Sequence, residues 1–135
     1  MNKMEKEFVN YNQALRLKAL GFDEPCMLFF SKELNMSIWL GLDERSVIIN
    51  KEKEDEDFLI PTFSQAFRWF REKYDMHYQL IPFYSDKEGP AVDYYFAQAH
   101  QLPPVKFKTY EEAELACLDK LIEIVEIKVL KYKSE

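Results

Sequence analysis

Three copies of one short pattern constrain the fold of this chain more than any other feature. Each copy has a capping residue, an aromatic residue, any residue, Gln or Glu, and then Ala. The copies are Asn10-Tyr11-Asn12-Gln13-Ala14, Thr62-Phe63-Ser64-Gln65-Ala66 and Thr109-Tyr110-Glu111-Glu112-Ala113. In such a capping box, the first side chain accepts a hydrogen bond from the backbone N–H three residues on, and the Gln or Glu side chain binds the backbone N–H of the cap. Each copy therefore predicts the start of a helix.

The first helix is expected to end at Gly21, because glycine takes the left-handed position that follows many helices. Phe22 would then pack back on Leu17. The second helix, over 62–74, has the clearest amphipathic pattern. At about 100° per residue its core side is shared by Phe63, Ala66, Phe67, Phe70 and Tyr74. Trp69 falls beside or opposite this core side, together with Arg68, Arg71, Glu72 and Lys73.

Apolar runs between the helices predict antiparallel hairpins. The predicted strands are 26–30, 36–40, 46–50, 78–84 and 93–97, with 105–108 as an edge strand. The charged stretch 51–57 contains no apolar residue and is expected to be a solvated loop. With 135 residues, the chain fits a single domain, 1–135. The predicted fold class is α+β: a helix-hairpin-helix-hairpin-helix quasi-repeat whose antiparallel strands carry the helices on one face.

The last predicted helix, over 110–131, has a wider apolar arc than one sheet face requires. Leu115, Ile122 and Val129 extend its main stripe on one side, and Ala116 and Ile127 extend it on the other. Two readings stay open. Either the rest of the domain wraps this helix, or the helix packs against a second copy in a homodimer.

Composition excludes several functional classes. The chain has three glycines and no Gly-rich phosphate loop, so P-loop and Rossmann nucleotide sites are excluded. The net charge is -6 and neither half is basic, which disfavours general nucleic-acid binding. Cys26 and Cys117 lack metal-ligand spacing with each other and with His77 or His100, so we predict no metal and no cofactor. No apolar run approaches membrane-span length, and a cytoplasmic location without membrane association is expected.

Catalysis is not expected. Cys117 lies on the buried stripe of the last helix, where a thiol stays protonated and inert. The carboxylates of Glu111, Glu112, Glu123 and Glu126 lie where that helix faces water. Neither set forms the paired acid and base, or the nucleophile with its base, that an active site needs.

The most suggestive surface is the cationic and aromatic set around the second helix. Arginine and aromatic residues are enriched at binding hot spots, and they can also stack a base and pair with a phosphate. The candidate binding residues of this surface are Arg68, Trp69, Arg71 and Lys73, with His77 just after them. Trp39, Tyr94 and Tyr95 are further candidates on predicted strands, where alternate aromatics point outward whether or not they bind anything. The competing interpretation is that Trp69 covers the margin of the core and the arginines pair with glutamates.

The segments 61–74 and 109–125, together with 10–22, resemble a family of short uncharacterised proteins of phages and prophages of Bacteroidetes. The resemblance implies a small accessory protein that acts inside a bacterial host cell. It carries over no functional residue.

Two functions are therefore expected. The first is a non-enzymatic accessory protein that binds a host or viral protein and interferes with host defence. The alternative is a module that holds a nucleotide or a short single strand of nucleic acid against Trp69, Tyr94 or Tyr95, with Arg68 and Arg71 on the phosphates.

Overall fold

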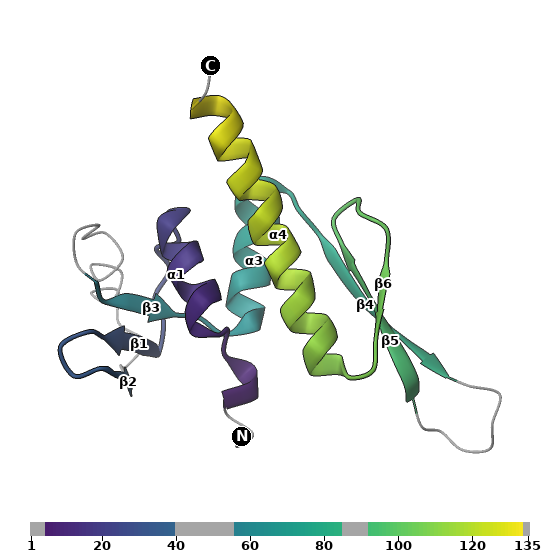
Figure 1. The fold of residues 1–135 in the computed structure, drawn as a ribbon, viewed down its shortest axis with the longest axis horizontal. Coiled ribbons are helices and arrows are strands. Elements are labelled where there is room, and N and C mark those ends of the chain that lie inside the picture. The colour runs from purple at the N-terminus through teal and green to yellow at the C-terminus, as the bar shows by residue number, and fades with distance from the viewer. Residues whose placement is uncertain (1–4, 40–55, 85–91, 134–135) are drawn as a thin grey trace. The chain divides into compact units, whose positions relative to one another are not determined.

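The computed structural model describes residues 5–39, 56–84 and 92–133 (Figure 1). The chain divides into two compact units, Met1–Ala66 and Phe67–Glu135. The boundary between the units falls inside the helix α3 (Phe63–Tyr74). The strand predicted at 46–50 and most of the predicted loop at 51–57 lie outside the described residues.

All three predicted helix starts are confirmed. At α1 (Tyr11–Ala19), the Asn10 side chain accepts from the Gln13 N–H at 2.8 Å, and the Gln13 side chain accepts from the Asn10 N–H at 3.1 Å. Thr62 and Gln65 make the same reciprocal pair before α3, at 3.1 and 3.0 Å. At α4 (Tyr110–Lys133), Thr109 Oγ1 accepts from a backbone N–H in the first turn at 3.1 Å. A short 3₁₀ helix, η1 (Glu5–Glu7), precedes α1.

The predicted end of α1 is also confirmed. Gly21 has a positive φ of 97°, in the left-handed region. The Phe22 N–H donates to the carbonyl of Leu17, and the Gly21 N–H donates to that of Lys18, both at 3.0 Å. These two bonds define a Schellman ending, which satisfies carbonyls that would otherwise lack partners at the helix end.

The first unit contains a three-stranded antiparallel sheet of order β2-β1-β3, formed by β1 (Leu28–Ser31), β2 (Met36–Trp39) and β3 (Phe58–Ile60). β1 and β2 are the predicted hairpin, whereas β3 was expected only as the segment leading into α3. The ring of Tyr11 in α1 contacts the rings of Phe30 and Phe58, with centroids 5.0 and 6.2 Å apart. α1 therefore packs on the sheet face that carries these two rings.

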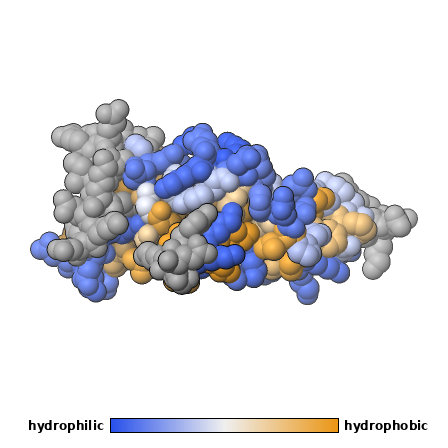
Figure 2. Space-filling model, turned by 90° about the horizontal axis from the view of Figure 1, so that it is seen from above, coloured by the Kyte–Doolittle hydropathy of each residue, from blue (hydrophilic) through white to orange (hydrophobic). Residues whose placement is uncertain are grey.

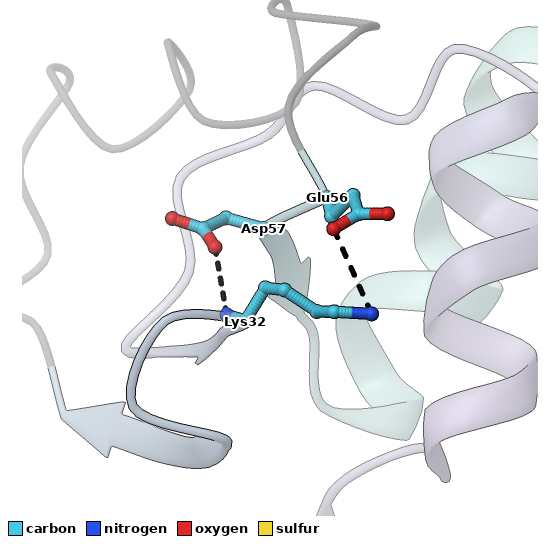
Figure 3. Close-up of polar contacts among 3 residues, drawn as sticks. All are labelled: Lys32, Glu56 and Asp57. Atoms are coloured by element: carbon cyan, nitrogen blue, oxygen red, sulfur yellow. Dashed lines mark hydrogen bonds and ion pairs between the residues drawn. The ribbon is translucent and has the colours of Figure 1, made fainter.

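Polar contacts join the turn after β1 to the residues just before β3 (Figure 3). The backbone N–H of Lys32 donates to the Asp57 carboxylate at 2.8 Å, and Lys32 Nζ lies 3.6 Å from the Glu56 carboxylate. Lys18 of α1 donates to the backbone carbonyl of Asp57. The exposed ion pair adds little stability. The two hydrogen bonds nevertheless fix where the three-residue strand β3 begins.

The second unit contains an antiparallel meander of order β4-β5-β6, formed by β4 (Tyr78–Tyr84), β5 (Val92–Ala99) and β6 (Val105–Phe107). The predicted hairpin and edge strand are thus confirmed. α4 lies against one face of this sheet and contacts all three strands (Figure 1). Pro82 lies in β4, at an edge of the sheet, which is where the missing N–H of proline is tolerated.

The α+β class is confirmed, but the quasi-repeat is not supported. In the first unit, the earlier strand of the hairpin is central and β3 pairs with it. In the second unit, the later strand of the hairpin is central and β6 pairs with it. The two sheets therefore have different connectivity, and one unit is not a copy of the other.

Four of the five residues predicted for the core side of α3 are buried, namely Phe63, Ala66, Phe67 and Phe70, and the fifth, Tyr74, is half-buried. Trp69, off this core side, is also buried and only 4% exposed, in agreement with the interpretation that it covers the margin of the core. The indole makes edge contacts with the rings of Phe70 and Tyr74, at 5.1 and 5.4 Å. Lys73 Nζ lies 4.9 Å from the centroid of the indole. A ring this long reaches the core from the flank of the helix.

Candidate functional site

The face of the β4-β5-β6 sheet opposite α4 is the main candidate surface. Successive side chains of a strand point to opposite faces. Ala97 and Ala99 are buried, and the ring of Tyr95 contacts the ring of Tyr110 in α4 at 5.7 Å, so these three residues of β5 face the helix. The residues that alternate with them face the other way. With their partners in the strand register, they form the open sheet face: Gln79, Ile81, Phe83, Tyr94, Phe96, Gln98 and Lys106.

The aromatic rings of the open sheet face are ordered around Tyr94. Its ring stacks on that of Phe83 across the strands, with centroids 4.6 Å apart and planes 12° apart. Lys106 Nζ lies 4.0 Å from the centroid of the same ring. Because β5 lies between β4 and β6, Phe83 and Lys106 approach Tyr94 from opposite sides. Phe96 makes an edge contact with Tyr94 at 5.2 Å. Both flat sides of the tyrosine ring are thus occupied within the protein.

The open sheet face combines apolar exposure with one positive charge. Ile81 is 43% and Phe83 45% exposed, while Tyr94 and Phe96 are half-buried. Figure 2, seen from above, shows hydrophobic side chains interspersed with hydrophilic ones toward the right, over the β4-β5 hairpin. Among the seven residues of this face, Lys106 alone is charged. Contiguous exposed apolar side chains of this kind mark interaction sites.

The structure does not gather the predicted binding residues into one site. Tyr94 lies on the open sheet face, whereas Tyr95 lies on the opposite face against α4. Trp39 belongs to β2 of the first unit, where it is 55% exposed and contacts the ring of Phe8 edge-on at 5.5 Å.

The candidate binding residues on and just after α3 do not form one site either. Arg68, Arg71 and Lys73 are exposed, while Trp69 is buried beneath Lys73. His77 follows the helix, and its Nε2 lies 3.1 Å from the exposed carboxylate of Asp75. The indole is therefore not available to stack on a ligand beside the arginines.

Sequence reasoning missed much of the open sheet face, including Ile81, Phe83 and Lys106. The useful signal was the alternation in both strands of the predicted hairpin, at 79, 81 and 83 and at 94, 96 and 98. Alternation alone does not show which residues of two strands lie opposite each other, or which face a helix covers. The register Phe83↔Tyr94 and Ile81↔Phe96 supplies that information.

Neither thiol is placed for chemistry. Burial, with the nearby carboxylate of Glu24 adding to its effect, raises the pKa of Cys26 to about 12. Burial, together with Glu114, likewise raises the pKa of Cys117 to about 12. A thiol that keeps its proton is a poor nucleophile and a poor metal ligand. Within the described ranges, no group of three or more His, Cys, Asp or Glu side chains is arranged to hold a metal ion.

None of the helices in the described part of the chain has the length and apolar character needed to cross a bilayer.

Comparisons with protein-family models, with curated proteins and with solved structures found no match. The functional interpretation therefore depends on the geometry of the chain itself.

Proposed function

We propose that this chain is a non-enzymatic protein-binding module that uses its open sheet face to bind a partner protein. The observation that supports the proposal is the cluster of Ile81, Phe83, Tyr94 and Phe96 on the side of the sheet opposite α4. Apolar and aromatic side chains at the centre of a patch supply most of the binding energy in protein interfaces.

The geometry of Tyr94 favours a protein over a nucleic acid on this face. A base stacks on the flat side of a ring, and both flat sides of Tyr94 already have partners. From Arg68 onward the chain has 10 basic and 12 acidic residues, so the second unit lacks the positive charge that concentrates phosphates. Ring edges and the branched tip of Ile81 instead suit apolar side chains of a partner.

The proposal also includes where the chain acts and what its binding achieves. The resemblance to phage and prophage proteins of Bacteroidetes is what supports a small accessory role in the cytoplasm of a bacterial host. A host or viral protein would be the partner, and interference with host defence would be the outcome of binding.

An affinity experiment with matched variants tests the proposal. The immobilised full chain is exposed to Bacteroidetes lysate alongside the variants Ile81→Asp and Leu34→Asp. Leu34 is 60% exposed but lies in the β1-β2 turn of the first unit, so it controls for a new surface carboxylate. We expect one stoichiometric protein that is retained by the wild type and by Leu34→Asp and is lost from Ile81→Asp. Retention of the same protein by all three forms would refute the role of the sheet face.

Nucleotide or single-strand binding is the second candidate function. It is favoured by the exposure of Arg68, Arg71 and Lys73 along one helix, although Trp69 is buried beside them. Fluorescence anisotropy titration with labelled nucleotides and short oligonucleotides tests it, because this signal does not depend on the buried indole. A saturable rise in anisotropy that disappears in Arg71→Ala would support this candidate, and no rise with the wild type would eliminate it.

Self-association through α4 is a separate proposal. Among the side chains of the helix that the structure describes, which end at residue 131, Val125 is the last buried one. Ile127 and Leu130, three residues apart on one side, are 56% and 67% exposed. Glu126 and Lys131 flank this apolar pair with opposite charges, which a second copy can complement. Sedimentation equilibrium should show a dimer that Leu130→Glu dissociates; a mass near 16.2 kDa at every concentration would exclude the dimer.

A further inference from the structure

We propose that the segment of the partner that binds the open sheet face is an amphipathic helix with a carboxylate beside its apolar stripe. This inference rests on the proposed function, because it specifies what kind of protein segment the face recognises. It follows from the spacing of the apolar side chains, from the edges of the sheet and from the charge of Lys106.

The apolar side chains of the face form two cross-strand pairs, Ile81 with Phe96 and Phe83 with Tyr94. The two pairs are two residues apart along each strand, which corresponds to a distance of about 6.8 Å. Apolar residues four apart on a helix are separated by about 6 Å along its axis. Two apolar residues at i and i+4 of a helix therefore match the spacing of the two pairs, and a further apolar residue at i+7 continues the same stripe beyond them.

The other face of the same sheet already binds a helix. α4 lies against all three strands and buries Ala113, Cys117 and Leu121 on its inner side. A sheet with two apolar faces is stabilised when a second layer covers the second face. A helix from the partner would complete a helix-sheet-helix sandwich.

Addition of a partner strand to the sheet edge is less suitable. Pro82 lies in the middle of the edge strand β4 and has no N–H to donate to a new strand. The opposite edge is β6, which is three residues long. Neither edge offers the long unbroken row of donors and acceptors that strand addition uses.

Lys106 sets the charge of the partner. Its Nζ lies over the ring of Tyr94 and its side chain is exposed, and no carboxylate belongs to the seven residues of the face. A carboxylate of the partner next to its apolar stripe would pair with this ammonium at the rim of the contact. The same charge would repel a basic amphipathic helix, which gives the face selectivity.

Selection from a library of displayed peptides tests the inference with a defined probe. Randomised peptides of about 18 residues, long enough for about five helical turns, are selected on the immobilised full chain, with counter-selection on Phe83→Asp. Enriched peptides should combine apolar residues at i, i+4 and i+7 with Asp or Glu beside them. Circular dichroism should show that a synthetic copy gains helicity on binding. Phe83→Asp should weaken its binding at least about tenfold, the effect expected of a central contact residue.

Charge reversal provides the decisive comparison. The Lys106→Glu variant should bind an enriched acidic peptide more weakly than the wild type does. When the carboxylate of that peptide is changed to Lys, the same variant should bind it again. The matched control is Lys32→Glu in the first unit, which should leave peptide binding unchanged.

The remaining outcomes distinguish failure of the helix inference from failure of the proposed protein-binding function. Enrichment of extended, Pro-rich or basic peptides that still depends on Phe83 would overturn the helix inference and leave the protein-binding function standing. Equal recovery on the wild type and on Phe83→Asp would reject the sheet face as a protein-binding site. A dimer in sedimentation equilibrium that Ile81→Asp dissociates would show that a second copy occupies the face, and would overturn the inference in that way.

Discussion

The ring of Phe83 stacks on the ring of Tyr94 across two strands, with centroids 4.6 Å apart, although 45% of the phenylalanine surface remains exposed. Cross-strand aromatic pairs stabilise a sheet by about 0.2 to 1 kcal/mol. The remaining exposed area contributes nothing to folding. The exposed part of Phe83 is the area that the proposed partner would cover.

Phe83→Ala should therefore cost little stability. We expect the free energy of unfolding to fall by no more than about 1 kcal/mol, because the substitution removes one cross-strand contact and creates no internal cavity. Urea denaturation followed by circular dichroism measures this change. The matched core variant is Phe70→Ala, at a position with 0% exposure, which should cost about 3 to 5 kcal/mol. Similar losses at both positions would show that Phe83 is a core residue.

The capping box before α3 should contribute measurably to stability. In Thr62→Ala, the Gln65 N–H loses the hydroxyl that accepts its hydrogen bond at 3.1 Å. The expected loss is about 1 kcal/mol, typical of a cap residue replaced by alanine. Ser64→Ala is the control, because Ser64 lies exposed in the same first turn without the capping role. The urea midpoint should shift for Thr62→Ala and stay within error for Ser64→Ala.

The left-handed residue after α1 should not tolerate a side chain. Gly21 has a φ of 97°, and Gly21→Ala would place a Cβ where it is sterically unfavourable. We expect a loss of about 1 kcal/mol in the free energy of unfolding. Gly21→Asn should recover part of that loss, because asparagine adopts left-handed backbone conformations more readily. Equal stability of all three forms in thermal melts would contradict this account of the helix end.

Local signals in the sequence predicted the helices and most strands well. The capping residues Asn10, Thr62 and Thr109 predicted the three helix starts, because a cap acts within four residues of the chain. Gly21 predicted the end of α1 for the same reason. The hairpin over β4 and β5 followed from apolar runs on either side of a turn.

The candidate site was less predictable, because it depends on contacts between distant residues. The register that sets Ile81 opposite Phe96 and Phe96 opposite Lys106 brings together three strands from different parts of the chain. Helix periodicity placed Trp69 off the core side. Periodicity gives only the direction of a side chain from the helix axis, and it does not show that a large indole ring is long enough to reach the core. The pairing of β3 with β1 spans 30 residues or so and likewise has no local signal.

The two buried thiols predict how stability depends on alkaline pH. Burial raises the pKa of both Cys26 and Cys117 from 9.0 to about 12. Below about pH 9 the thiols are protonated in both the folded and the unfolded chain, so they do not change stability with pH. Between about pH 9 and 12 the unfolded chain releases these protons and the folded chain keeps them, so the free energy of unfolding falls as the pH rises. Burial also raises the pKa of Tyr78, which acts in the same direction.

The measurement compares the wild type with Cys26→Ala/Cys117→Ala by urea denaturation at several pH values between about 8 and 11. The double variant should lose less stability over this range than the wild type, since only Tyr78 and other retained groups still contribute to its alkaline loss. In the folded wild type, both thiols should react slowly with a disulfide reagent near neutral pH and rapidly once urea unfolds the chain. Parallel alkaline losses in the two proteins, or fast labelling of the folded protein, would show that the thiols are not held protonated in the core.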